Sequence, residues 1–172
     1  MSRKRNVTVA AVQMKCSTDV EENIAKADAL VREAAEKGAQ IILLPELFER
    51  QYFCQERRYE YYEFAKEVNE NDAVKHFSAL AKELSVVIPV SFYEKDVNRL
   101  FNTVAVINAD GSNLGIYRKT HIPEDGRISF GCYVRPSIFV VCRFQGIRNE
   151  IRFLASFNRQ KAFCIKSCRG NH

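Results

Sequence analysis

The sequence predicts an α/β fold in which helices cover a β-sheet. Two short apolar segments, 6–14 and 40–45, are separated by an amphipathic helical pattern. A second amphipathic pattern at 72–84 precedes another apolar segment at 86–94. A hairpin pattern at 100–119 then contains Asp-Gly, a dipeptide typical of tight β-hairpin turns.

The first strand is expected at 6–14, where valine alternates with small residues. Thr18 or Asp19 can cap the helix that follows, and Gly38 is expected to end it. The next strand, at 40–45, is a continuous apolar run that ends at a proline. Strand, helix and strand in this order are typical of a sheet covered by helices.

The second helix is expected at 72–84 because its apolar residues fall on one face: Val74, Phe77, Leu80, Ala81 and Leu84. The strand at 86–94 contains Pro89, which suits an edge or a bulge better than the middle of a ladder. Asp110 and Gly111 are expected to turn the hairpin that follows.

The charge of the chain changes after residue 125. Residues 126–172 contain nine Lys or Arg residues and one acidic residue, a net charge of +8. Subtracting these from the totals of 26 and 21 leaves residues 1–125 with 17 basic and 20 acidic residues, a net charge of −3. This asymmetry predicts two segments of different origin or role, a domain portion at 1–125 and a basic tail of unknown fold at 126–172.

The sequence favours a cytoplasmic protein. No apolar run approaches the roughly 18 residues that a membrane span needs, and the N-terminus lacks the apolar core of a signal peptide. We therefore expect the six cysteines to be free thiols rather than a disulfide framework.

Glu46 is the first candidate catalytic residue. It directly follows the strand at 40–45, and sites in open α/β sheets collect beyond the carboxyl ends of strands. Its apolar neighbours are expected to desolvate the carboxylate, which suits a general base near neutral pH. On spacing alone, a helix-capping or salt-bridged glutamate stays an open alternative.

Lys119 is the second candidate, at the end of the hairpin pattern. A lysine there is either a solvated edge charge or a fixed cation that stabilises an oxyanion. His121, two residues later, has no evident partner and is a weak candidate.

Three segments carry a family resemblance: "VAAVQM" (9–14), the segment from Ala35 to Phe48 around "KGAQIILLPELF", and "YRKTHIP" (117–123). Together they resemble the nitrilase, or carbon–nitrogen hydrolase, superfamily. Within it, "ELFERQYFCQ" (46–55) and "AKELSVVIPVSFYE" (81–94) look most like the N-carbamoylputrescine amidases of polyamine synthesis.

The resemblance covers residues 6–125 and implies an αββα sandwich with a Glu-Lys-Cys catalytic set. Glu46 matches the general base and Lys119 the lysine that stabilises the intermediate. A cysteine attacks the carbamoyl carbon in this family, and ammonia, carbon dioxide and putrescine are the products from N-carbamoylputrescine. The resemblance implies no metal and no organic cofactor.

The resemblance stops after "HIPED" (121–125). The family continues to a further active-site glutamate and to a Cys-Trp-Asp segment, whereas this chain contains no Trp and 126–139 offers no such glutamate. Arg50 also stands where the family tends to have glycine. We therefore expect an incomplete first half of the sandwich, truncated before the nucleophile and inactive as an enzyme.

Two other cysteines are alternatives to the missing nucleophile. Cys142 follows an apolar run and precedes a turn, but it lies 23 residues after Lys119 without flanking matches, and Cys132 is closer still. Ordinary cysteines are the simpler interpretation of both. The spacing of Cys164, Cys168 and His172 only weakly suggests zinc, because a fourth ligand is missing.

The expected partners follow from these alternatives. An active site would take a small carbamoyl amine. An incomplete sandwich leaves apolar faces and strand edges uncovered, which predicts a homo-oligomer or association with full-length subunits. The arginines and phenylalanines of the tail could contact nucleic acid, although they match no known motif, and a replaced C-terminus is the plainer interpretation.

Overall fold

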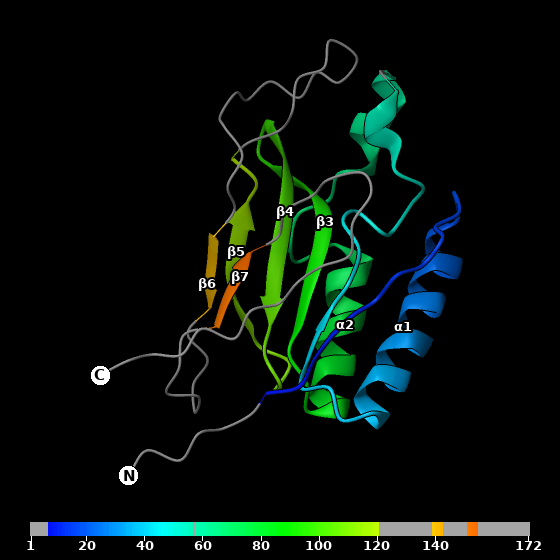
Figure 1. Cartoon of the computed structure of the whole chain (residues 1–172). Helices are drawn as coiled ribbons and strands as arrows, with labels where there is room; N and C mark the ends of the chain where they lie inside the picture. The colour runs from blue at the N-terminus through cyan, green and yellow to red at the C-terminus, as the bar shows by residue number, and fades with distance from the viewer. Residues whose placement is uncertain (1–6, 57, 121–138, 143–150, 155–172) are drawn as a thin grey trace. The chain divides into compact units, whose positions relative to one another are not determined.

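A computed structural model of the 172-residue chain describes residues 7–56 and 58–120, together with the backbone of strands at 139–142 and 151–154 (Figure 1). The chain divides into two compact units, Met1–Arg118 and Lys119–His172, and each is described by itself. The predicted division at residue 125 stays a prediction, and most of the basic tail lies outside the described residues.

The first unit contains both helices and five of the strands that the structure describes. In chain order its elements are β1 (Val9–Ala11), α1 (Val20–Glu36), β2 (Ile41–Leu43), the 3-10 helices η1 (Phe53–Gln55) and η2 (Tyr59–Phe64), α2 (Asp72–Leu84), β3 (Ile88–Asp96), β4 (Arg99–Ile107) and β5 (Asn113–Arg118). The strand, helix and hairpin order expected from the sequence is confirmed, although β1 and β2 are shorter than expected.

The strands of the first unit pair both in parallel and antiparallel. β1 pairs with β2 in parallel, with Val9 opposite Ile41, and an isolated parallel bridge joins Ile41 to Val87 just before β3. β3, β4 and β5 form an antiparallel sheet in that order. Pro89 lies just beyond the Val87 bridge, where its lack of an N–H prevents the parallel ladder from continuing.

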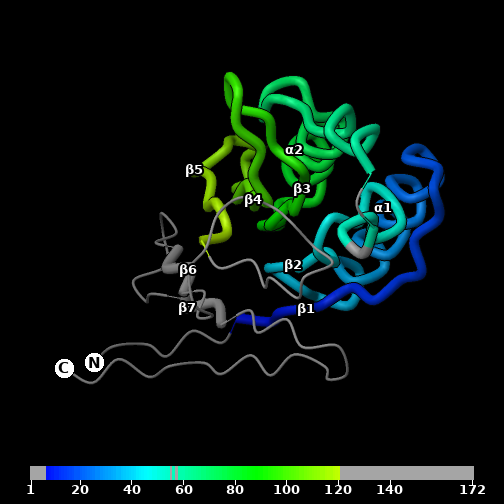
Figure 2. The backbone as a smooth tube through the Cα atoms, turned by 90° about the horizontal axis from the view of Figure 1, so that it is seen from above, coloured from blue at the N-terminus to red at the C-terminus, as the bar shows by residue number. Residues whose placement is uncertain are grey.

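Both helices lie on the same side of the strands (Figures 1 and 2). α2 spans the residues that the sequence predicts and is capped by Asn71, whose Oδ1 accepts from the Val74 N–H at 2.9 Å. α1 is capped by Asp19, whose Oδ1 accepts from the Glu22 N–H at 2.9 Å. Each cap satisfies an amide that the helix leaves without an internal partner.

The core lies between the helices and the sheet. Its side chains come from α1, α2, β2, β3 and β4 and alternate along β3, where Ile88, Val90 and Phe92 are all fully buried. Phe48 packs edge-on against Phe77 of α2, with ring centroids 5.6 Å apart. The segment after β2 is therefore part of the core rather than a surface loop.

Two hairpins connect the antiparallel strands. The turn between β4 and β5 contains Gly111 at φ +85°, and a Cβ there would lie 2.8 Å from the backbone oxygen of Ser78, so the turn requires glycine. The turn between β3 and β4 places Val97 at φ +54°. The sequence gives no glycine signal for this second turn, and the pattern analysis missed it.

The described part of the second unit contains β6 (Phe139–Cys142) and β7 (Ile151–Leu154), which pair antiparallel with Phe139 opposite Leu154. Among the residues that the structure describes, no helix is long and apolar enough to cross a membrane.

Candidate active site

Glu46 begins a turn at residues 46–49, which Leu44 and Pro45 separate from the end of β2. Its side chain is partly exposed, and its Oε1 accepts from Asn102 Nδ2 of β4 at 2.6 Å. An amide donor aimed at one carboxylate oxygen fixes the orientation of the side chain. Glu46 thus lies three residues past the end of β2 rather than directly after it, its catalytic role stays a prediction, and the structure adds Asn102 as a hydrogen-bond donor to it.

The backbone of this turn takes an unusual conformation at Leu47, with φ +51°. A branched residue in the left-handed region costs about 1–3 kcal/mol and needs support from its surroundings. Leu47 is buried, and its N–H donates to Ser91 Oγ of β3 at 3.1 Å. Arg50, at the position where the resemblance suggests glycine, does not take a positive φ.

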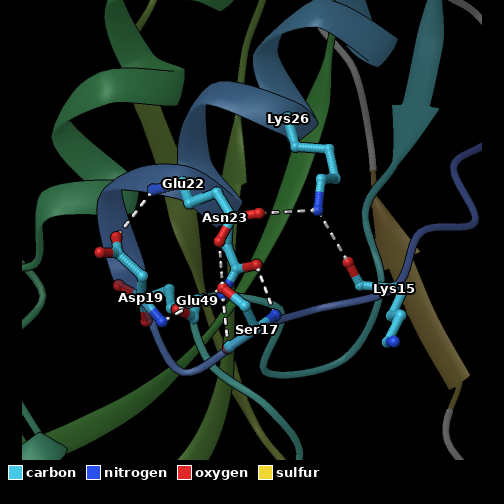
Figure 3. A network of polar contacts seen from close by, with 7 residues as sticks. All are labelled: Lys15, Ser17, Asp19, Glu22, Asn23, Lys26 and Glu49. Carbon is cyan, nitrogen blue, oxygen red and sulfur yellow. Dashed lines mark hydrogen bonds and ion pairs between the residues drawn. The ribbon is translucent and has the colours of Figure 1, made fainter.

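Two buried asparagines attach the turn to the helices. Asn23 of α1 donates to the Ser17 and Glu49 carbonyls at 2.8 and 3.1 Å, while its Oδ1 accepts from the Ser17 N–H at 2.9 Å (Figure 3). Asn71 donates to both carboxylate oxygens of Glu49 at 3.0 and 3.1 Å, while its own oxygen caps α2. Polar contacts from α1, α2, β3 and β4 thus hold the segment that carries Glu46.

Burial shapes the electrostatics beside this turn. It raises the pKa of Glu49 from its ordinary value of 4.5, an effect that the hydrogen bond from Asn71 and the charges of Lys66 and Arg50 only partly offset. Burial also raises the pKa of Tyr93 in β3. These groups lie in a region from which water is partly excluded.

Lys119 directly follows β5 and is partly exposed. It falls in the second unit, so its pairing with Glu46 stays a prediction. The residue before it, Arg118, donates to both carboxylate oxygens of buried Glu94 at 2.8 and 2.7 Å and to Asp96 at 2.7 Å. This bidentate pair fixes the end of β5.

The first unit contains two cysteines, Cys16 and Cys54. Cys54 is buried, and burial raises the pKa of the Cys16 thiol, partly opposed by Lys26. Cys142 ends β6, but its side chain lies outside the described residues.

His121, Cys132, Cys164, Cys168 and His172 also lie outside the described residues. Within residues 7–56 and 58–120, no group of three or more His, Cys, Asp or Glu side chains could hold a metal ion. The weakly suggested zinc site is therefore not tested.

Comparison with known sequences identifies the class of protein. A profile described as carbon-nitrogen hydrolase matches residues 8–146, and the chain belongs to this family. The matched region extends beyond residue 125 into the basic segment.

Several curated relatives align with about 120 residues of the chain. N-carbamoylputrescine amidase from Oryza sativa subsp. japonica is 56% identical over 119 residues, which are 69% of this chain and 39% of that protein. The enzyme of the same name from Arabidopsis thaliana is 50% identical over 122 residues, 71% of this chain and 41% of that protein. Citrullinase from Francisella tularensis is 43% identical over 119 residues, 69% and 42% of the two chains. This chain thus spans about two fifths of the length of these relatives.

Solved structures confirm the α/β, nitrilase-type fold. A carbon-nitrogen hydrolase from Helicobacter pylori G27 has a TM-score of 0.64 at 31% identity, over 70% of this chain and 41% of that one. Nit3 of Saccharomyces cerevisiae, a member of the nitrilase superfamily, has a TM-score of 0.62 at 22% identity, over 80% and 52% of the two chains, and shows the fold alone. This chain therefore forms part of a nitrilase-superfamily fold.

The residues that hold the Glu46 turn were not predicted from the sequence. Asn102, Ser91, Asn71 and Asn23 come from four elements that lie far apart in the sequence. The available signal was an asparagine at a helix N-cap for Asn71 and a polar residue inside an apolar strand for Ser91.

Proposed function

We propose that this chain provides part of a carbon–nitrogen hydrolase of the N-carbamoylputrescine amidase type. Glu46 is its general base, and Lys119 is the cation that stabilises the oxyanion of the tetrahedral intermediate. The observation that carries the proposal is the placement of Glu46 beyond β2, held there by Asn102, in a chain 50–56% identical to plant N-carbamoylputrescine amidases over the matched region.

The 172 residues lack the Cys-Trp pair of the family, since the chain contains no Trp. A covalent nucleophile and its base act as one unit, so its loss removes most of the rate. We therefore propose that this polypeptide alone does not hydrolyse N-carbamoylputrescine to putrescine, carbon dioxide and ammonia. Its place in polyamine biosynthesis and in the cytoplasm is part of the same proposal.

Ammonia release from N-carbamoylputrescine tests this function. The purified chain is assayed beside Glu46→Ala and Cys142→Ala, and we expect no release above the buffer rate from any of them. Release by the unsubstituted chain that both substitutions abolish would mean that Cys142 serves as the nucleophile, and the proposed inactivity would be wrong.

The second candidate function is a non-catalytic partner of full-length subunits. It is favoured by the exposed apolar side chains of β5, where Leu114 and Ile116 are 45% and 40% exposed. Exposed apolar residues on a sheet strand are typical of surfaces that another chain covers. Co-purification with a full-length amidase would support this role, and no association at micromolar concentration would refute it.

A further inference from the structure

An open pocket of about 170 Å³ lies beside the Glu46 turn, within the first unit. Its lining includes Leu47 and Glu49 of the turn, Phe53 and Phe64 of the 3-10 helices, and Tyr93 of β3. Pockets for drug-sized ligands are typically about 300–1,000 Å³, so this one suits a smaller molecule. It does not include Glu46 itself among its lining residues.

Glu49 is the least exposed of the three acidic residues that line this pocket, Glu21, Glu49 and Asp72. Its carboxylate accepts from one donor, Asn71 Nδ2, at 3.0 and 3.1 Å. A carboxylate can accept about four hydrogen bonds, so much of its capacity is unused by that contact. In the described part of the chain Glu49 forms no ion pair within 4.0 Å.

The cations of the pocket are already engaged elsewhere. The Lys66 ammonium pairs with Asp72 at 2.5 Å. The Arg50 guanidinium lies 4.1 Å from the centre of the Phe64 ring, and its Nη1 donates to the Thr18 carbonyl at 3.3 Å. Neither is within ion-pair distance of Glu49, so their charges offset the charge of the carboxylate only in part.

Aromatic rings also line the pocket. Phe53 contacts both Phe64 and Tyr93, with ring centroids 5.6 and 5.2 Å apart. Ring faces attract cations, and the alkyl part of a ligand gains from burial against such a wall. A pocket lined by both a carboxylate and aromatic rings matches a short aliphatic ammonium ion.

We infer that this pocket binds the terminal ammonium group of a short aliphatic amine, with Glu49 as its counter-ion and Phe53 and Tyr93 against its alkyl chain. The choice of amine rests on the proposed function, because both N-carbamoylputrescine and putrescine carry such a group. Glu49 is then a binding residue for the amine end of the ligand, separate in role from Glu46.

The inference requires a particular pH dependence. The ammonium binds the ionised carboxylate, so affinity rises with pH as Glu49 loses its proton. The charged groups that face Glu49 are Lys66 and Arg50, which favour the ionised form, and Asp72, which opposes it. Aliphatic amines remain protonated to about pH 10, so the ligand itself does not titrate in this range.

Isothermal titration calorimetry of the purified chain with 1,4-diaminobutane tests the inference, with 1,4-butanediol as the uncharged probe of matched length. We expect binding of the diamine only, and at least a tenfold loss of affinity in Glu49→Gln, equal to about 1.4 kcal/mol. Glu63→Gln is the matched control, because Glu63 is an exposed glutamate outside the pocket lining. Affinity for the unsubstituted chain rises as the pH is raised above 4.5, and this rise is absent in Glu49→Gln.

No heat of binding from the diamine at 10 mM would overturn the inference, as would an affinity in Glu49→Gln within threefold of the unsubstituted chain. Equal binding of the diol would also overturn it, because it would make the charge irrelevant. The ammonia assay is independent of this result. If the chain binds the diamine but releases no ammonia, the result supports the pocket inference and the proposed inactivity of the chain. If the chain releases ammonia and Glu49→Gln does not weaken diamine binding, the amine is recognised at another site.

Discussion

Replacing Asn71 by alanine tests whether hydrogen bonds from the N-terminus of α2 stabilise the turn that carries Glu46. Asn71 is 1% exposed and makes contacts in two directions. Its oxygen accepts from the Val74 N–H at the start of α2, and its amide nitrogen donates to the carboxylate of Glu49. Alanine removes both contacts and leaves the carboxylate of Glu49 without its hydrogen-bond donor.

The expected cost follows from those two losses. An N-cap side chain contributes about 1 kcal/mol, and a hydrogen bond to an ionised group about 1.5–3 kcal/mol. The free energy of unfolding is therefore expected to fall by roughly 3 kcal/mol in Asn71→Ala. For a urea m-value of about 2 kcal/mol/M, the unfolding midpoint falls by about 1.5 M.

Urea unfolding followed by far-ultraviolet circular dichroism measures this change, since the chain has no Trp for fluorescence. Asn71→Ser is the matched control, because serine still caps a helix but does not supply the amide donor to Glu49. We expect it to be about 1 kcal/mol more stable than Asn71→Ala. Surface substitutions usually change the free energy of unfolding by no more than about 0.5 kcal/mol. A change of that size or smaller in Asn71→Ala would refute the account of the turn.

Three further predictions concern stability. Gly111→Ala is expected to lower the free energy of unfolding by more than about 1 kcal/mol, because a Cβ at φ +85° would lie 2.8 Å from the Ser78 backbone oxygen. Thermal unfolding measures this change, and an unchanged midpoint temperature would contradict the prediction. Arg118→Met is expected to lower the free energy of unfolding, measured with urea, by about 3 kcal/mol, because it leaves the buried Glu94 carboxylate without its bidentate partner. A decrease of less than about 1 kcal/mol would argue against a stabilising role for that pair. The raised pKa of Glu49 means that the folded chain holds this proton more tightly than the unfolded chain. The stabilising effect of this proton is therefore present at low pH and is lost as the pH rises from 4.5 through the raised pKa. We expect the free energy of unfolding of Glu49→Gln, relative to that of the unsubstituted chain, to increase with pH over this range. A difference that does not change with pH would show that Glu49 titrates normally.

Local patterns in the sequence predicted much of the fold. The period of α2, the Asp-Gly turn and the strand before Glu46 each depend on residues close together in the chain, which is why α2 was placed at its observed bounds. β1 and β2 were predicted longer than they are. Their apolar residues continue past the paired segment, and burial rather than pairing explains those residues.

The surroundings of Glu46 could not be predicted in the same way. Asn102 is 56 residues away in the sequence, and Ser91 reaches the Leu47 amide across 44 residues. Such contacts depend on strand register and on a left-handed backbone at Leu47, neither of which has a local sequence signal. The family resemblance suggests roles for Glu46 and Lys119, which stay predictions, but does not indicate the side chains that hold the turn.

The most direct test of the central proposal, that Glu46 is the general base of a polypeptide that lacks the nucleophile, is intact-mass spectrometry. The chain is incubated with N-carbamoylputrescine, quenched in acid and measured for a covalent carbamoyl adduct, which an attacking thiol in this family would form as ammonia or the amine leaves. The account predicts an unchanged mass. A carbamoyl adduct that maps to Cys142, and that disappears in Cys142→Ala, would contradict it.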